Sequence, residues 1–255
     1  MTSNEYIRPP GTYYDIVSHP MNVNSAIEIA IVQEHRFAFF YWLKWRNKSE
    51  LSTPPSLISL DWHRDLGHPC ATECEWLKKL DTNDYKEVSY FCWDKLHPLN
   101  DGHILAAAYL NIIGDIHVLQ KQAGVSVEDF KDLTGKNHVV HCYQSIDELI
   151  EGVSSQKHSS VIFDVDLDYF TESSDRNGGG KNVKLVTAEE IRGCLNPHGK
   201  LMSWVFPRIH GMTIATEPEF CGGLLNSNIQ FGVLHDTLFN PPLLGHGTAG
   251  WKHQT

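Results

Sequence analysis

Three polar residues at alternate positions close the stretch SLISLDWHRD, and their types suit metal chemistry. Asp61, His63 and Asp65 follow an apolar run at 57–60. In an extended chain, side chains at i, i+2 and i+4 point to the same side, so two carboxylates and an imidazole would converge at the end of a buried strand. Like charges held that close resist ionising together unless a cation neutralises them. A divalent metal binds both ligand types, so this stretch predicts part of a metal site.

A second acidic cluster repeats this pattern. Asp164, Asp166 and Asp168 in IFDVDLDYF follow another apolar run. A calcium loop also begins D-x-D-x-D, but it requires Gly at its sixth position and Glu at its twelfth. Those positions hold Tyr169 and Asp175 here. Two acidic clusters that each end an apolar strand therefore favour a shared metal site over a calcium loop or a solvated acidic turn.

An earlier histidine completes the set of candidate ligands. His35 lies between a predicted strand at 27–32 and a predicted helix whose Phe37, Tyr41 and Trp45 share one face. Such strand-to-helix junctions are where α/β proteins place their chemistry. The candidate metal ligands are two imidazoles and four carboxylates: His35, Asp61, His63, Asp65, Asp164 and Asp166.

The composition of this ligand set indicates the metal. Oxygen-rich, thiolate-free ligation suits a hard divalent ion such as Mn²⁺. Six ligands exceed what one zinc needs, so we expect two ions ~3.5–4 Å apart with bridging carboxylates. A water between such ions becomes hydroxide near neutral pH and can attack an electrophilic carbon. A purely structural metal site is less consistent, because those sites are typically Cys- and His-rich and four-coordinate.

Strands and helices alternate along the chain, which predicts a mostly parallel sheet covered on both faces. We expect a single three-layer α/β/α domain over 1–255, with Asn100 or Asp101 capping the helix at 103–113 and Ser145 capping the next. The expected strands are at 27–32, 57–60, 115–119, 138–143, 160–163, 201–206 and 212–215, and the expected helices are at 37–45, 103–113, 127–133, 145–153, 187–195 and 228–239. The Gly-rich segment 171–182 is expected to form a flexible loop beside the second acidic cluster.

The overall composition limits the functional classes. With 21 Lys and Arg against 31 Asp and Glu, the net charge is −10, which argues against a nucleic-acid binder. Six dispersed cysteines favour reduced thiols and a cytoplasmic location. The sequence shows no signal-peptide pattern and no apolar run of membrane-spanning length. Assembly into a homo-oligomer stays open.

The two acidic motifs resemble those of a known enzyme family. DWHRD at 61–65 resembles the D-x-H-x-D motif of the arginase-like ureohydrolases, FDVDLD at 163–168 is similar to their D-x-D motif, and His35 falls where their earlier histidine ligand belongs. The phrases NDGH, DLDYF and EPEF more specifically resemble the peptide arginases. Those enzymes convert arginine side chains of a precursor peptide to ornithine and release urea. The resemblance implies an arginase-like fold, two Mn²⁺ ions and an arginine-containing peptide partner.

The resemblance also implies a ligand set for each ion. One Mn²⁺ would be held by His35, Asp61, Asp65 and Asp164, and the other by His63, Asp61, Asp164 and Asp166, with Asp61 and Asp164 as bridges. Ureohydrolases usually continue D-x-D with Gly-Leu-Asp-Pro, whereas this chain continues with Leu-Asp-Tyr-Phe. Whether Asp168 enters the metal site is therefore open.

Substrate and proton-transfer residues follow from the same resemblance. Glu219 in TIATEPEFCGG matches the glutamate that would bind guanidinium, with Glu217 as the reserve; an exposed loop glutamate is the alternative interpretation. His103 resembles the family's proton-shuttle histidine, and Asp65 is a candidate to relay the proton lost by the attacking water. Other candidates for the general acid are His68 and His97.

The expected function is manganese-dependent hydrolysis of arginine side chains in a peptide, by a metal-bridging hydroxide, to ornithine and urea. Three alternatives remain: a small-molecule ureohydrolase of the arginase or agmatinase type, a single-zinc amide deacetylase, and a non-catalytic metal- or peptide-binding protein.

Overall fold

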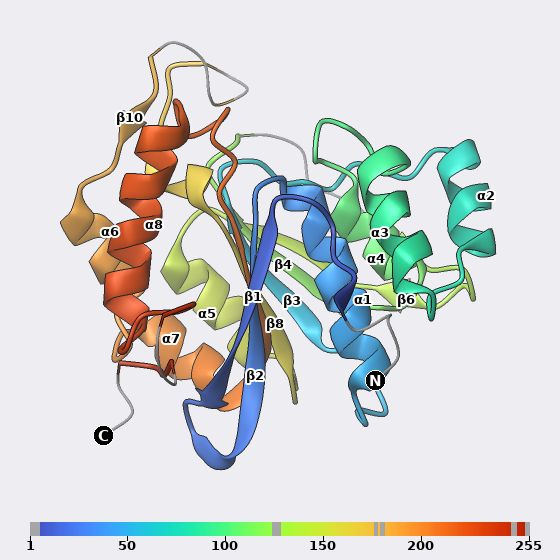
Figure 1. Cartoon of the computed structure of the whole chain (residues 1–255), viewed down its shortest axis with the longest axis horizontal. Helices are drawn as coiled ribbons and strands as arrows, with labels where there is room; N and C mark the ends of the chain where they lie inside the picture. Colours follow the sequence, from blue (N-terminus) through green and yellow to red (C-terminus); the bar gives the residue numbers. More distant parts are fainter. Residues whose placement is uncertain (1–5, 124–128, 176–177, 179–181, 246–248, 253–255) are drawn as a thin grey trace.

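A seven-stranded sheet crosses the centre of the molecule in the order β1-β2-β11-β8-β3-β4-β7 (Figure 1). The computed structural model describes residues 6–123, 129–175, 178, 182–245 and 249–252. Within this sheet β1 and β2 pair antiparallel, and the other described neighbouring pairs are parallel. The strands are β1 (Thr12–His19), β2 (Asn22–Val32), β3 (Ser56–Asp61), β4 (Ile116–Gln120), β7 (Val140–Tyr143), β8 (Val161–Asp166) and β11 (Ile209–Ala215). The predicted mostly parallel sheet is confirmed.

Helices cover both faces of this sheet, and each face has its own apolar core (Figure 1). One face carries α1 (Ala38–Lys48), α2 (Ala71–Lys79), α3 (Tyr85–Asp94) and α4 (His103–Tyr109). The other carries α5 (Ile146–Ser154), α6 (Ala188–Cys194), α7 (Lys200–Val205) and α8 (Leu224–Leu238). The three-layer α/β/α architecture is therefore confirmed. None of the helices in the described ranges is both long and apolar enough to cross a membrane.

Helix α1 packs closely on strand β11 because the strand has a glycine at the contact. A Cβ atom at Gly211 would lie 2.6 Å from Cε3 of Trp45, a side chain that is buried in the core. Trp42, one turn earlier, donates a hydrogen bond from Nε1 to Thr213 Oγ1 at 3.1 Å. These contacts fix α1, and with it the residues that precede the helix, against the centre of the sheet.

Two predicted elements are wrong. The segment 201–206 forms helix α7 rather than a strand, because Leu201, Met202 and Val205 occupy one helical face and are buried against the sheet. The predicted helix at 127–133 is instead a short strand, β5 (Phe130–Lys131), where the structure describes it, and it pairs with β6 (Asn137–His138). Gly135, with φ 84, supplies the turn between them.

The start of α4 also differs from the prediction. Its N-cap is Gly102, and neither Asn100 nor Asp101 caps the helix with its side chain. The helix ends at Tyr109 rather than 113, and Asn111 then adopts a left-handed conformation that cannot continue it. By contrast, Ser145 caps α5 as predicted, since its Oγ accepts a hydrogen bond from the Glu148 N–H. The segment predicted as a flexible Gly-rich loop lies partly outside the described residues.

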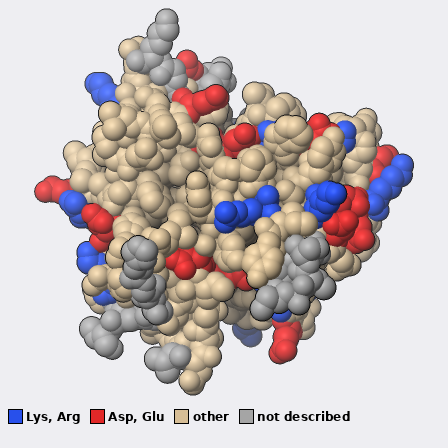
Figure 2. Space-filling model, viewed as in Figure 1, with Lys and Arg blue, Asp and Glu red and all other residues tan. Residues whose placement is uncertain are grey.

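Acidic and basic side chains are interspersed on the molecular face shown in Figure 2, where Lys and Arg do not gather into one block.

Candidate metal centre

Acidic side chains meet at the carboxyl ends of two neighbouring central strands. Asp61 ends β3 and Asp166 ends β8, and these strands pair in parallel. Asp168 follows in the 3-10 helix η3 (Leu167–Phe170), and His35 begins the 3-10 helix η2 (His35–Phe37) just after β2. All four of these residues are buried. The fold therefore brings together three segments that are far apart in the sequence.

The imidazole of His35 faces three carboxylates. Its Nδ1 lies 3.0 Å from Asp65 Oδ2, 3.1 Å from Asp166 Oδ2 and 3.4 Å from Asp61 Oδ2. His63 lies at the other side of the cluster, with Nδ1 2.9 Å from Asp168 Oδ2 and 3.7 Å from Asp61 Oδ1. Asp61 thus lies between the two histidines, as a bridging ligand would.

Within the described residues, four groups of three side chains each place their ligand atoms within 4.8 Å of one another. Together these groups include His35, Asp61, His63, Asp65, His103, Asp166, Asp168 and Glu217. Most of the candidate ligands therefore converge. Asp164 belongs to none of the groups, and Asp168 does.

Asp164 lies one step deeper in the sheet, behind His35. The strand register pairs it with Ser59 on β3 and Thr213 on β11. Its carboxylate accepts hydrogen bonds from Ser59 Oγ at 2.7 Å and Thr213 Oγ1 at 2.5 Å, and it lies 2.8 Å from His35 Nε2. These contacts occupy both carboxylate oxygens. Asp164 is therefore placed to orient His35, with Nε2–H directed at Asp164 and Nδ1 directed at the cluster, instead of joining the cluster itself.

The charges of the cluster perturb one another strongly. Burial raises the pKa of Asp65 and of Asp166 well above the usual value, and a neighbouring carboxylate adds to the shift in each case. Burial would lower the pKa of His35, but the charge and hydrogen bond of Asp164 and the hydrogen bonds of other aspartates raise it well above its usual value. Burial would also lower the pKa of His63, yet Asp168 and Asp61 raise this pKa to about 12.

This pattern fits a divalent cation. Carboxylates at this density either retain protons or share a cation, and metal binding would displace those protons. Asp61 Oδ2 is buried and accepts no hydrogen bond within the described part of the chain, although it lies beside His35. Two imidazoles and four or more carboxylates without a thiolate form a donor set suited to hard divalent ions. The residues therefore fit a metal centre.

A buried glutamate adjoins the cluster, and it is Glu217 rather than Glu219. Glu217 Oε1 accepts hydrogen bonds from the His35 backbone N–H at 2.9 Å and from Asn100 Nδ2 at 2.6 Å. Burial raises its pKa well above the usual value, and the charge of Asp166 adds to the shift. Glu219 is exposed two residues further on. Glu217, the reserve candidate for binding guanidinium, thus lies beside the cluster, while Glu219, the first candidate, lies at the surface.

Both glutamates line a cavity of about 310 Å³ next to the cluster. Among the described lining residues one is basic, Arg36, and its guanidinium is bound by Glu34 at 2.6 Å. The remaining lining residues are Gln33, Pro98, Asn100, Pro218 and Phe220. A cation that enters this cavity would meet the carboxyl groups of its lining, and the described basic side chain there is already paired.

The candidate proton-transfer histidines differ in position. His103 is fully buried, its ring centroid lies 4.3 Å from that of His35, and its Nδ1 donates a hydrogen bond to the Asn100 carbonyl at 2.9 Å. Burial, with the charge of His35, lowers the pKa of His103 to about 3. His97 is exposed and paired with Asp101 at 2.7 Å, and His68 is exposed beside Phe130. Of these three, only His103 joins a ligand group with Asp65.

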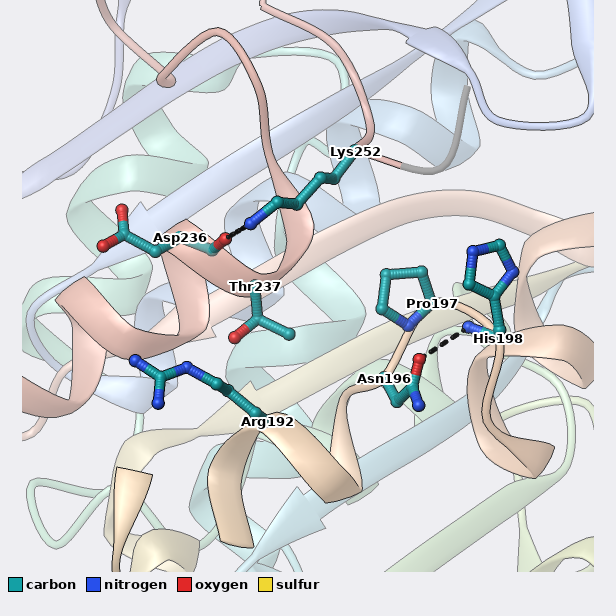
Figure 3. Close-up of a pocket in the computed structure, with 7 residues that line it drawn as sticks. All are labelled: Arg192, Asn196, Pro197, His198, Asp236, Thr237 and Lys252. Atoms are coloured by element: carbon teal, nitrogen blue, oxygen red, sulfur yellow. Dashed lines mark hydrogen bonds between the residues drawn. The ribbon is translucent and has the colours of Figure 1, made fainter. Parts of the chain in front are cut away.

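A second cavity, of about 350 Å³, is lined by a separate set of residues (Figure 3). Arg192 on α6 and Lys252 come from different elements, and the Lys252 side chain points toward Asp236 (Figure 3). Lys252 Nζ donates to the Asp236 backbone carbonyl at 2.5 Å. This cavity shares no lining residue with the metal-ligand groups.

The fold and the cluster together define an α/β protein with a buried His/Asp centre at the carboxyl ends of parallel strands. No protein-family profile and no curated protein matches the sequence. Among solved structures, the fold is similar to proclavaminate amidino hydrolase from Streptomyces clavuligerus, with a TM-score of 0.45 and 12% identity, over 81% of this chain and 62% of that one. The chain thus spans less than two thirds of that protein. So distant a likeness transfers neither site nor activity, and the resemblance to peptide arginases stays a prediction.

Proposed function

We propose that the protein is a manganese-dependent hydrolase that converts arginine side chains of a peptide to ornithine and urea. The observation that carries this proposal is the buried His/Asp cluster with the Glu217 carboxylate beside it and an acidic cavity in front. A cluster of this composition suits two hard cations, and a carboxylate beyond it suits a cationic guanidinium.

The proposed ligand set is revised to follow the geometry. Asp166 would take the place expected of Asp164, and Asp168 would take the place expected of Asp166. One ion would then be held by His35, Asp61, Asp65 and Asp166, and the other by His63, Asp61, Asp166 and Asp168. When bound, the two ions would acidify a water and polarise the guanidinium carbon toward its attack.

The chain's own residues would bind and orient the substrate. Glu217 would hold the guanidinium, because its carboxylate is buried next to Asp166 and Asp168 and its Oε1 is fixed by two hydrogen bonds. Glu219, at the surface of the same cavity, would attract cationic peptides without fixing them. Asp65 lies between two imidazoles, 3.0 Å from His35 Nδ1 and 4.0 Å from His103 Nδ1, and remains the candidate for proton relay.

The charge of the cavity favours peptidyl arginine over free arginine. A free amino acid would bring its α-carboxylate toward Glu34, Glu217 and Glu219, and Arg36 is already paired with Glu34. Arginine within a peptide carries no such carboxylate. Agmatine also lacks one, so it belongs in the same experiment.

The test combines metal analysis with three substrates. The Mn²⁺-loaded protein is incubated with an arginyl peptide, free arginine or agmatine, and urea release is measured together with mass spectrometry of the peptide. We expect two ions per chain and urea from the peptide, with none from the Asp61→Asn variant. Turnover of agmatine alone would indicate a small-molecule enzyme, and one bound zinc with amide hydrolysis would indicate a deacetylase. No turnover of any substrate, despite two bound ions, would refute the proposal.

A further inference from the structure

Asn100 contacts two residues of the candidate centre and has an unusual backbone conformation. Its φ of 61° lies in the left-handed region, which asparagine adopts more readily than most residues. Its side-chain Nδ2 donates to Glu217 Oε1 at 2.6 Å, and its carbonyl accepts from His103 Nδ1 at 2.9 Å. Such a conformation is retained where the side chain or the carbonyl must be held in place.

The orientation of the Asn100 amide is fixed by its partner. Glu217 Oε1 accepts the His35 N–H, and the NH₂ group of Asn100 donates to the same oxygen. The amide oxygen, Oδ1, is then turned away from Glu217. This Oδ1 is buried and has no hydrogen-bond partner among the described residues. A buried acceptor left without a partner is costly, and a bound ligand is one way to satisfy it.

Asn100, the residue that carries the unsatisfied oxygen, lines the proposed substrate cavity. Asn100 and Glu217 both line the cavity of about 310 Å³. The pair therefore presents a charged acceptor and a neutral acceptor held at a fixed separation by their own hydrogen bond. A planar guanidinium offers five N–H donors in a rigid fork and can meet both acceptors at once, whereas an ammonium is a compact point charge with freely rotating donors.

We infer that Asn100 determines specificity for guanidinium over ammonium, both by holding Glu217 in place and by offering Oδ1 as a second acceptor. This inference rests on the proposed function for the location of the substrate site. It adds a residue that the sequence motifs did not single out as a ligand, and it names the feature of the substrate that the residue recognises.

The test compares the binding of two matched peptides, one containing arginine and one containing lysine at the same position. Affinities for the Mn²⁺-loaded protein are measured by calorimetry for the parent and for Asn100→Gly. Glycine accepts the positive φ, so this variant removes the amide without straining the backbone. Loss of hydrogen bonds to a charged group should reduce the affinity for the arginyl peptide about tenfold or more, and that for the lysyl peptide much less.

Two further variants separate recognition from folding. Asn111→Gly is a matched control, because Asn111 also has a positive φ, of 54°, and contacts Lys136 instead of the cluster. It should leave both affinities unchanged. Asn100→Asp keeps the size but replaces the donor by a second carboxylate, so it should bind both cations and lose the preference between them. All variants should bind two metal ions.

The outcomes keep this inference distinct from the proposed function. If the parent prefers the arginyl peptide and Asn100→Gly removes that preference, the inference holds, even where no urea is released. If urea is released but Asn100→Gly retains the full preference, the inference is wrong and the proposed function stands. A parent protein without any preference for arginine over lysine overturns the inference as well.

Discussion

Asp164 and Asp168 have identical side chains, but their different contacts indicate different roles. Asp168 belongs to a ligand group with Asp166 and Glu217, whereas Asp164 is bound by Ser59, Thr213 and His35. We expect Asp168→Asn to lose one of two bound Mn²⁺ ions. Asp164→Asn should keep both, with affinity weakened about 10–100-fold, because it disturbs only the orientation of His35. Metal analysis after dialysis measures the stoichiometry; a loss of metal only in Asp164→Asn would reverse the assignment.

Glu217 and Glu219 form a second matched pair. Glu217 is buried beside the cluster, and Glu219 is exposed. Removing a buried charge that pairs with the substrate costs about 2–5 kcal/mol, so Glu217→Gln should lower kcat/KM for an arginyl peptide by 30-fold or more. Exposed pairs contribute about 0–1 kcal/mol, so Glu219→Gln should change it by less than about fivefold. Steady-state kinetics on both variants decides between them, and a larger loss in Glu219→Gln would return the binding role to that residue.

Residue types and spacing were sufficient to locate most of the candidate centre. Alternate polar residues after an apolar run predicted that each acidic motif would lie at the end of a strand, and Asp61 and Asp166 do end β3 and β8. The sequence could not show which two of three alternate aspartates reach the cluster. That choice depends on where β8 ends and on hydroxyl groups of adjacent strands, Ser59 and Thr213, which are remote in sequence. Asn100 belongs to no motif other than the phrase NDGH. Its contact with Glu217 joins positions 117 residues apart, so the sequence could not predict it.

The close contact of α1 with β11 leads to a prediction about folding stability. Gly211→Ala would place a methyl group 2.6 Å from the Trp45 ring, and overpacking of this kind costs about 1–3 kcal/mol. Gly193→Ala on the exposed side of α6 meets no atom within 4 Å and should stabilise the protein slightly, by about 0.4–1 kcal/mol. Urea unfolding of both variants provides the measurement. Equal stability of the two variants would contradict this account of the packing.

Sequence patterns predicted the elements unevenly, for reasons of local structure. The helix at 145–153 was correct because its cap is a local interaction between Ser145 and Glu148. Segment 201–206 was predicted as a strand, but tertiary packing of a helical face overrode the β propensity of Trp204, Val205 and Phe206. Strand β1 was missed because Pro9, Pro10 and Gly11 suggested irregular structure, while its pairing with β2 is long-range information.

Over the whole molecule, a buried neutral histidine links stability to pH. His117 stacks on His141, contacts His158 and Tyr143, and burial lowers its pKa to about 3. The unfolded chain takes up a proton near pH 6.5, whereas the folded chain does not, so folding stability falls as pH drops below 6.5. The loss from this group is about 1.4 kcal/mol per pH unit.

The contribution of His117 to this pH dependence can be isolated by comparing the parent protein with a variant. The free energy of unfolding of the parent and of His117→Gln is measured at pH 7.5 and pH 5. The parent should lose about 2 kcal/mol more than the variant over that interval, since the window below pH 6.5 spans about 1.5 units. Identical pH dependence in both proteins would exclude His117 as a source.

Metal binding should stabilise the fold as a whole. The buried carboxylates repel one another without a cation, and an ion that binds the folded chain alone adds about 2.7 kcal/mol at 100 times its Kd. Thermal unfolding with Mn²⁺ or with a chelator measures this increase. Asp61→Asn should show little response to Mn²⁺, and an unchanged melting temperature in the parent protein would contradict the presence of a resident ion.

The contact between the His35 backbone and Glu217 joins positions 182 residues apart in the chain. A complete set of the proposed metal donors needs both the segment 35–65 and the segment 166–168, which lie in opposite halves of the polypeptide. Added manganese would therefore act after the sheet has closed and could not nucleate folding, unlike zinc in a zinc finger. In a stopped-flow refolding experiment, uptake of the ion should coincide with the slowest structural phase.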